Sequence, residues 1–254
     1  RAAEFYRTAN AMPSAYCFPY RLESIRVLRD AIATCPSDAR AYYYLGNLLY
    51  DLQPEKAIAA WEKSRDIDHT FATAHRNLGY AYSKREDDYP KAITEYEQSV
   101  ACDNGDPRVY YELEQLYKTA GTAPGTRLAL LTKNQATTDK RSDLVTSQVS
   151  LFVQTGQYDT AIDMLTNRRF DAFEGATQIH DSYVEAHTLR GKKTLEAGKA
   201  QDALRDFEAA LEYPKNLGVD RPLQDPRAAR THLLIASAYE TLGDAQNSRA
   251  PLEE

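Results

Sequence analysis

Three features of the sequence predict an all-α fold. Leu45-Gly46 and Leu78-Gly79 stand 33 residues apart, and each pair is followed by an Ala-x-x-x-aromatic-x-x-Ser segment. Apolar residues recur at helical spacing along most of the chain. Runs of β-branched residues are short and leave no convincing strand signal. We therefore expect consecutive helical hairpins.

The residues of the repeated pattern have packing roles. We expect Gly46 and Gly79 where the two helices of a hairpin cross closely, with Trp61 and Tyr96 filling the space beside them. A single hairpin of this kind cannot bury its apolar face, so neighbours stack and the core continues along the array.

The period and the motif resemble the tetratricopeptide (TPR) helix-turn-helix repeat. The segments that carry the resemblance are Tyr44-Leu45-Gly46-Asn47-Leu48-Leu49-Tyr50 and Asn77-Leu78-Gly79-Tyr80-Ala81-Tyr82. The resemblance implies a right-handed α-solenoid of about six TPR-like hairpins, forming a single domain over residues 1–254, and a protein-binding scaffold.

The same template predicts the remaining hairpins in order. In one unit Glu114 replaces the glycine, and the stretch 121–125 interrupts the pattern after it, so this repeat is degenerate. Gly156, Gly191 and Gly243 mark three later units, and a long loop precedes the second of these. The expected repeats span about 1–36, 39–69, 72–105, 107–138, 141–168, 182–215 and 226–254.

A closer resemblance is to the C-terminal helical array of large, uncharacterised bacterial proteins. It is carried by Tyr16-Cys17-Phe18-Pro19, by His75-Arg76-Asn77-Leu78-Gly79, and by Arg169-Phe170 leading to Glu174-Gly175. In those proteins β-sandwich domains that look like sugar-mutarotase or glycoside-processing modules precede the array. Here Phe170, Phe173 and Glu174 are expected to anchor the long loop to the array, with ligand contact as the alternative.

The composition limits the partners and the compartment. The formal charge of −6 and a pI near 5.5 argue against nucleic acid, and no apolar run approaches the ~18 residues of a membrane span. Cys17, Cys35 and Cys102 are expected to be buried free thiols. We expect a segment of a longer bacterial protein, in the cytoplasm, or in the periplasm if the full-length protein carries a signal peptide.

The first helices of successive repeats are expected to line a ligand groove. Counting from Gly46, Gly79 and Glu114 gives its side chains: Arg40, Tyr43, Asn47, Tyr50, Arg76, Tyr80, Lys84, Arg108, Tyr111 and Gln115. Tyrosine offers a flat apolar ring and a hydroxyl, which suits peptides and sugar rings alike. The alternative for some tyrosines is that they fill the seams between helices, above all Tyr42, Tyr44, Tyr82 and Tyr110.

One TPR binding mode, the two-carboxylate clamp for chaperone tails, fits poorly. The mode needs Lys where Tyr43 stands and Asn where Tyr80 stands, and Glu112 replaces a basic residue. A chaperone tail is therefore not expected, whereas peptides in general remain candidates.

No motif for independent catalysis is present, whether a Gly-rich phosphate loop, Gly-x-Ser-x-Gly or His-Glu-x-x-His. His180 and His187 would lie about 10 Å apart on one helix, too far to share a metal ion. With Asp181 and Glu185 they are expected to cap and solvate a helix that starts near Asp181 or Ser182. We expect no enzyme activity, metal site or cofactor in this segment.

Two functions from different classes are expected. The first is a scaffold that binds a protein or peptide, including upstream β domains of the same chain, in the tyrosine-rich groove. The alternative is a helical accessory domain of a carbohydrate-active bacterial enzyme, whose catalytic residues lie outside this segment. Self-association through the end of the last repeat is a third hypothesis.

Overall fold

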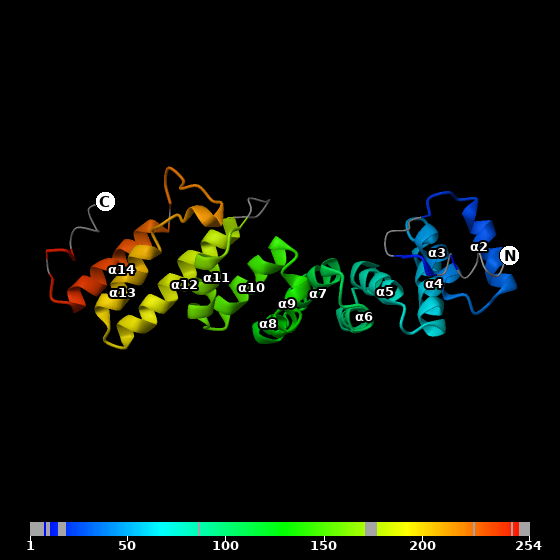
Figure 1. Ribbon diagram of the computed structural model, residues 1–254, viewed down its shortest axis with the longest axis horizontal. Coiled ribbons are helices and arrows are strands. Elements are labelled where there is room, and N and C mark those ends of the chain that lie inside the picture. The colour runs from blue at the N-terminus through cyan, green and yellow to red at the C-terminus, as the bar shows by residue number, and fades with distance from the viewer. Residues whose placement is uncertain are drawn as a thin grey trace. The chain divides into compact units, whose positions relative to one another are not determined.

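The computed structural model describes residues 8, 11–14, 19–85, 87–170, 177–225, 227–244 and 246–248. The chain divides into two compact units, Arg1–Thr122 (unit 1) and Ala123–Glu254 (unit 2), each described by itself below. Among the described residues every regular element is a helix (Figure 1), which confirms the predicted all-α class.

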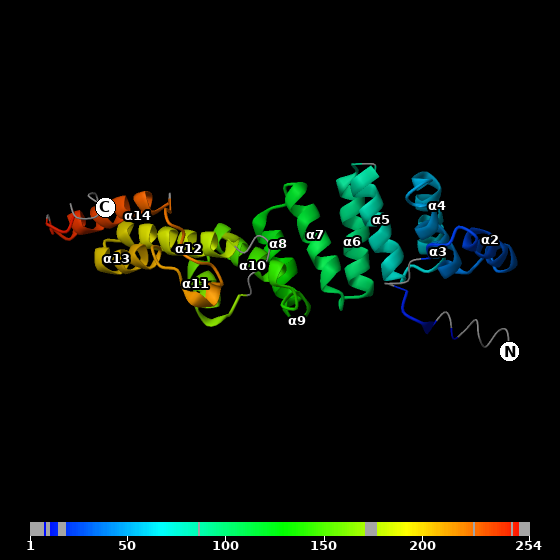
Figure 2. The same cartoon turned by 90° about the horizontal axis from the view of Figure 1, so that it is seen from above.

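In unit 1 each helix packs against the next one in the chain. Figure 2 shows α5, α6 and α7 side by side. The helices are α2 (Ser24–Thr34), α3 (Ala39–Leu49), α4 (Pro54–Ile67), α5 (Ala72–Arg85), α6 (Tyr89–Cys102) and α7 (Pro107–Thr119).

Local sequence signals explain where several of these helices begin. The carboxylates of Asp38, Asp88 and Asp106 accept hydrogen bonds from first-turn backbone N–H groups at 2.9 to 3.1 Å. Pro54 and Pro107 stand at the first position of α4 and α7, where the missing N–H has no partner to lose.

The glycine packing predicted for unit 1 is confirmed. A Cβ atom on Gly46 would lie 2.4 Å from Nε1 of Trp61, and one on Gly79 would lie 2.6 Å from Cδ2 of Tyr96. Both aromatic rings are buried, so each fills the space that its glycine leaves open.

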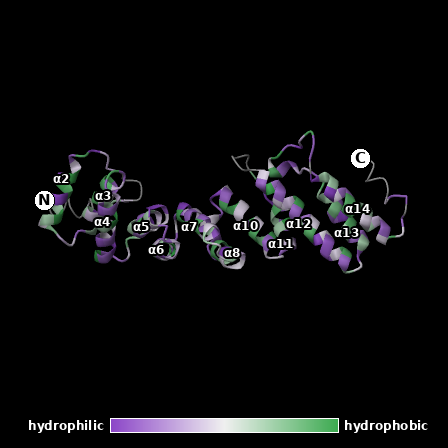
Figure 3. Ribbon diagram, turned by 180° about the vertical axis from the view of Figure 1, so that it is seen from behind, coloured by the Kyte–Doolittle hydropathy of each residue, from purple (hydrophilic) through white to green (hydrophobic). Residues whose placement is uncertain are grey.

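Unit 2 continues with helices of the same kind. They are α8 (Pro124–Lys133), α9 (Gln135–Thr138), α10 (Ser142–Gln154), α11 (Tyr158–Asn167), α12 (Thr177–Glu196), α13 (Ala200–Ala209), the 3-10 turn η1 (Lys215–Leu217) and α14 (Ala228–Thr241). Part of the core lies between α13 and α14, where Phe207 packs with Leu204 and Ile235. Figure 3 shows hydrophobic and hydrophilic residues interleaved along the helices, as amphipathic packing requires.

Two sequence-based expectations about single residues are wrong. Cys35 is only partly buried and Cys102 is exposed, because both lie at helix ends rather than on core faces; both are free thiols, and Cys17 lies outside the described residues. The helix expected to begin near Asp181 or Ser182 begins at Thr177, with Ile179 fully buried in its first turn.

Within the described part of the chain, no helix has the length and apolar character that crossing a bilayer requires.

Candidate ligand groove

A pocket of about 280 Å³ lies in unit 1, between α5 and α7 and beside α6. Four of the predicted groove residues line it: Tyr80, Lys84, Tyr111 and Gln115. Helix α6 contributes Tyr89 and the buried Tyr96. Four tyrosines therefore line one small cavity, together with the exposed Lys84.

The repeat register explains why these residues meet. Tyr80 and Lys84 follow Gly79 by one and five residues, and Gln115 follows Glu114 by one. Positions separated by about one turn share a helix face, so these side chains leave the seam that the glycine occupies and point to the same surface.

An ion pair joins the two helices beside the pocket. Nε of Arg76 on α5 donates to Oε2 of Glu112 on α7 at 2.8 Å, and Nη2 donates to Oε1 as a second contact. Burial works against the charge of Arg76, but the hydrogen bond and charge of Glu112 outweigh it and raise the pKa of Arg76. The guanidinium also lies 6.0 Å from the ring of Tyr80, which places that ring beside a fixed cation.

The aromatic surface continues from the pocket toward the end of α3. The ring of Tyr80, 40% exposed, lies 6.0 Å from the ring of Tyr50, which in turn lies 5.1 Å from Trp61. Arg85 stands 5.4 Å from the Tyr50 ring. Tyr50 is half-buried, so only part of its side chain is exposed on this surface.

The structure places Tyr43 in the core of unit 1, not on an open groove. Its side chain is 1% exposed, and its hydroxyl donates to the carbonyl oxygen of Ser14 at 3.4 Å. The ring lies 5.0 Å from Phe71 at the start of the next hairpin. The prediction that Tyr43 lines the groove is wrong, because Ser14 and Phe71 of the same chain cover its side chain.

The remaining predicted groove residues in unit 1 stabilise the fold. The Oδ1 atom of Asn47 accepts from Nε1 of Trp61 at 3.0 Å and from Nδ2 of Asn77 at 2.9 Å, so it joins three helices. Arg40 donates to the carbonyl of Met12 at 2.8 Å, and Arg108 contacts Asp106 at 3.4 Å. Tyr82 and Tyr110 are fully buried, as the seam alternative states for them.

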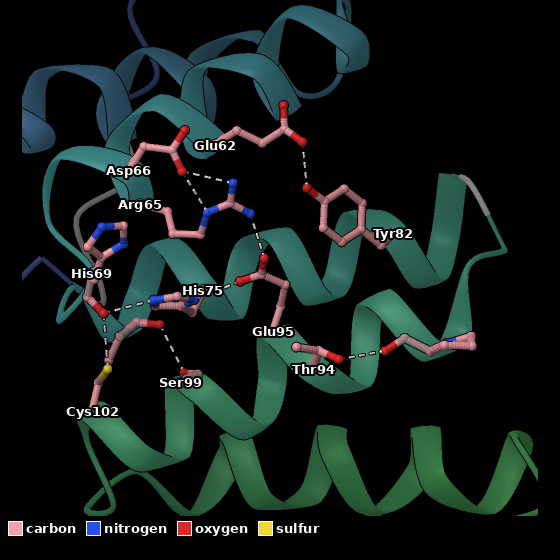
Figure 4. Close-up of polar contacts among 12 residues, drawn as sticks. Glu62, Arg65, Asp66, His69, His75, Tyr82, Thr94, Glu95, Ser99 and Cys102 are labelled. Carbon is pink, nitrogen blue, oxygen red and sulfur yellow. Dashed lines mark hydrogen bonds and ion pairs between the residues drawn. The ribbon is translucent and has the colours of Figure 1, made fainter.

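A buried polar network lies between α4, α5 and α6 (Figure 4). Oε1 of Glu95 accepts from Nη1 of Arg65 at 2.6 Å, and Oε2 lies 2.6 Å from Nδ1 of His75. Nε2 of His75 lies 3.0 Å from the carbonyl oxygen of His69. Both ring nitrogens of His75 already have hydrogen-bond partners, so neither nitrogen is left to contact a substrate. The ring acts as a structural cross-link.

Unit 2 contains a matching network. Nδ1 of His187 lies 2.8 Å from Oδ1 of Asp206, and Arg190 donates to both oxygens of that carboxylate and to Asp159. His187 and Asp206 are buried. The expectation that His187 solvates the surface of its helix is therefore wrong, because α13 covers this side of α12.

His180 is also buried. Its ring stacks on Tyr213 at 3.9 Å, Nε2 donates to the carbonyl of Glu212 at 2.9 Å, and Nδ1 accepts from Arg227 at 3.2 Å. Burial, with the charge of Arg227, lowers the pKa of His180 below its ordinary value and so disfavours the charged ring. In the described part of the chain, no group of three or more His, Cys, Asp or Glu side chains is placed to hold a metal ion.

Phe170, the last described residue before the stretch expected to form the long loop, is buried in unit 2. Its backbone N–H donates to the carbonyl of Asn216 at 2.7 Å, and the Asn216 amide donates to the carbonyls of Leu165 and Arg168. Phe173 and Glu174 lie outside the described residues.

A second groove pocket, which the sequence reasoning missed, lies in unit 2 between α12 and α14. It has a volume of about 400 Å³, and its lining includes Glu185, Thr188, Arg227 and Arg230. Counting back six and three residues from Gly191 leads to Glu185 and Thr188, and the offset of three from Gly79 leads to Arg76. The same register, counted from Gly191, therefore places Glu185 and Thr188 on the groove face. From the sequence, Glu185 was expected only to solvate its helix.

Comparison with known proteins agrees with the fold. Residues 188–254 match the family Tetratricopeptide repeat. The crystal structure of YrrB, a TPR protein with an unusual peptide-binding site, is 18% identical, with a TM-score of 0.50 over 74% of this chain and 92% of that chain. The structure of Naa15/Naa10 bound to HypK-THB is 14% identical, with a TM-score of 0.62 over 90% of this chain but only 33% of that chain.

At these identities the likeness to solved structures shows the fold, and the family match covers the last part of the chain. Together with the glycine packing in successive hairpins, they establish the architecture. The protein is a TPR-like α-solenoid whose residues 188–254 match the tetratricopeptide repeat family.

Proposed function

We propose that this protein is a protein-interaction scaffold and that unit 1 binds an extended peptide segment of a partner between α5 and α7. The observation that carries the proposal is the tyrosine-lined pocket of about 280 Å³, to which Tyr80, Lys84, Tyr111 and Gln115 contribute.

The chemistry of the pocket supports a peptide ligand. Tyrosine rings bury apolar side chains at a low cost in conformational entropy, and their hydroxyls can bond to a peptide backbone. The exposed ammonium group of Lys84 adds a preference for a carboxylate at one end of the bound segment. The Arg76–Glu112 ion pair holds the two helices, so the pocket is preorganised before a ligand arrives.

The fold supports the same proposal. YrrB, which shares the architecture, is a TPR protein with a peptide-binding site, and we extend peptide binding to this chain as a proposal. A β domain of a longer chain, as the resemblance to large bacterial proteins implies, would be one source of such a segment.

Selection of peptides from a displayed library on the purified protein tests the proposal. We expect the selected peptides to lose about tenfold or more in affinity with Tyr80→Ala or Tyr111→Ala, because aromatic anchors dominate such interfaces. Tyr20→Ala is the matched control, since Tyr20 is an exposed tyrosine (82%) that does not line the pocket. Selected peptides that bind all three variants equally would place the site elsewhere.

The four tyrosine rings also favour a sugar as the second candidate, in keeping with an accessory domain of a carbohydrate-active enzyme. A glycan array with the same three variants separates the two. If glycans bind, if their binding requires Tyr80 and Tyr111, and if no peptide binds, the carbohydrate proposal would replace the peptide proposal.

A further inference from the structure

A polar pocket of about 690 Å³ lies in unit 2, lined by α11, α12 and α13. Four cationic side chains reach it: Arg190, Lys193, Lys199 and Arg205. It shares no lining residue with the α12–α14 pocket, and its chemistry differs from that of the tyrosine pocket of unit 1.

Three carboxylates also line this pocket, and they fall into two kinds. Asp206 is buried and is held by His187 and Arg190, so it belongs to the fold. Asp159 is 90% exposed at its side chain and contacts Arg190 at 2.8 Å. Asp202 is likewise exposed and contacts Arg205 at 3.1 Å. Exposed pairs of this kind contribute little to stability, so another carboxylate can replace Asp159 or Asp202 at small cost.

The two lysines complete the site. Lys193 and Lys199 are exposed, and among the residues that the structure describes neither has an ion-pair partner. Lys193 follows Arg190 by almost one helical turn, so the two cations share a face of α12. The pocket therefore offers two ammonium groups whose charge the fold does not neutralise, beside two arginines that each have one exposed and replaceable carboxylate partner.

We propose that this pocket binds a short acidic segment of a protein partner, rich in aspartate or glutamate, through Lys193, Lys199 and the outer nitrogens of Arg190. The ligand carboxylates pair with the lysines, and one of them takes the place of Asp159 on Arg190, while Asp206 keeps that guanidinium in position. The formal charge of −6 repels a long polyanion such as nucleic acid, whereas a short segment places its charge inside the pocket.

Calorimetric titration of the full chain with a blocked hexapeptide of alternating Asp and Glu tests this site, with the Asn/Gln hexapeptide for comparison. We expect the acidic peptide to bind and the Asn/Gln peptide not to bind. The affinity for the acidic peptide should fall as the salt concentration is raised. The double variant Lys193→Ala/Lys199→Ala should bind about tenfold more weakly. Lys192→Ala is the matched control, because Lys192 is the neighbouring lysine on α12 and does not line the pocket. Tyr80→Ala in unit 1 should leave this binding unchanged, which separates the outcome from that of the peptide groove.

Three results would overturn the proposal. The first is no binding of the acidic peptide to the wild-type chain, and the second is an equal loss in Lys192→Ala. The third is binding of inorganic phosphate, and not of the peptide, with the same dependence on the two lysines, which would assign the pocket to a phosphate group. Far-UV circular dichroism of each variant confirms that the helices are intact in every comparison.

Discussion

His75 and His187 occupy the same place in two hairpins. Each lies four residues before the glycine of its repeat, Gly79 or Gly191, and each pairs with a carboxylate that directly precedes the aromatic residue packed on that glycine. Glu95 precedes Tyr96, and Asp206 precedes Phe207. The pairing depends on which helix faces which, so the residues near each histidine in sequence did not indicate it.

The network around His75 predicts a pH dependence of stability. Burial opposes the charged ring, but the hydrogen bond to Glu95 outweighs it, and the pKa of His75 is raised above its ordinary value of 6.5. Burial likewise opposes the charged carboxylate of Glu95, but His75 and Arg65 lower its pKa below 4.5. The contribution of His75 is complete below pH 6.5 and is lost as pH rises through its raised pKa. That of Glu95 is complete above pH 4.5 and is lost as pH falls through its lowered pKa.

We therefore expect His75→Gln to cost most in the free energy of unfolding between pH 4.5 and 6.5, and less at higher pH. Urea unfolding of the variant and the wild type across a pH series measures this difference. His69→Gln is the control, since it removes an exposed ring and keeps the carbonyl that His75 contacts. A difference that stays constant across the series would show that the charge of His75 does not contribute.

Residue types alone did not tell packing tyrosines from groove tyrosines. The register counted from the glycines placed both Tyr43 and Tyr80 on the groove face. Tyr43 is 1% exposed and Tyr80 is 40% exposed. The difference arises because Ser14 and Phe71 cover Tyr43, and Ser14 lies 29 residues away in the chain.

Among the helical elements, the close crossings beside Trp61, Tyr96 and Phe207 each depend on a glycine. We expect Gly79→Ala to destabilise the protein by roughly 1–3 kcal/mol, because its Cβ would lie 2.6 Å from the buried ring of Tyr96. Thermal and urea unfolding measure the change.

Gly125→Ala is the matched control for this substitution. Gly125 is the second residue of α8, and a Cβ there would meet no atom within 4 Å, so alanine should stabilise by about 0.4–1 kcal/mol by reducing the entropy of the unfolded chain. A Gly79→Ala protein as stable as the wild type would mean that the Tyr96 ring can move aside.

Helix starts followed the local signals only where such signals exist. The helices α3, α6 and α7 begin at aspartate caps that the sequence displays. The start of α12 at Thr177 comes instead from burial of Ile179 and His180, which the residues around them do not signal.

Glu114, in the place of a repeat glycine, is fully buried, and Gln115 donates to it at 2.8 Å. The seven repeat boundaries stay a prediction.

At the scale of the whole molecule, the division into two compact units predicts independent folding. In a helical-repeat protein each hairpin contacts mainly its neighbours, so stability is close to a sum of local terms. We expect residues 1–122 and 123–254, expressed separately, each to show helical circular dichroism and a cooperative thermal transition. A fragment that melts without a transition would show that its unit needs the other to fold.

The helical class and the pairing of Gly46 with Trp61 and of Gly79 with Tyr96 could be read from the chain, because period, small residues and aromatics repeat over short distances. The polar contacts between helices, within a hairpin and between neighbouring hairpins, could not. They bury His75 against Glu95 and place Arg190 between Asp159 and Asp206. Such groups lie 16 to 31 residues apart in sequence, and no local pattern shows which of them will meet until the hairpins stack.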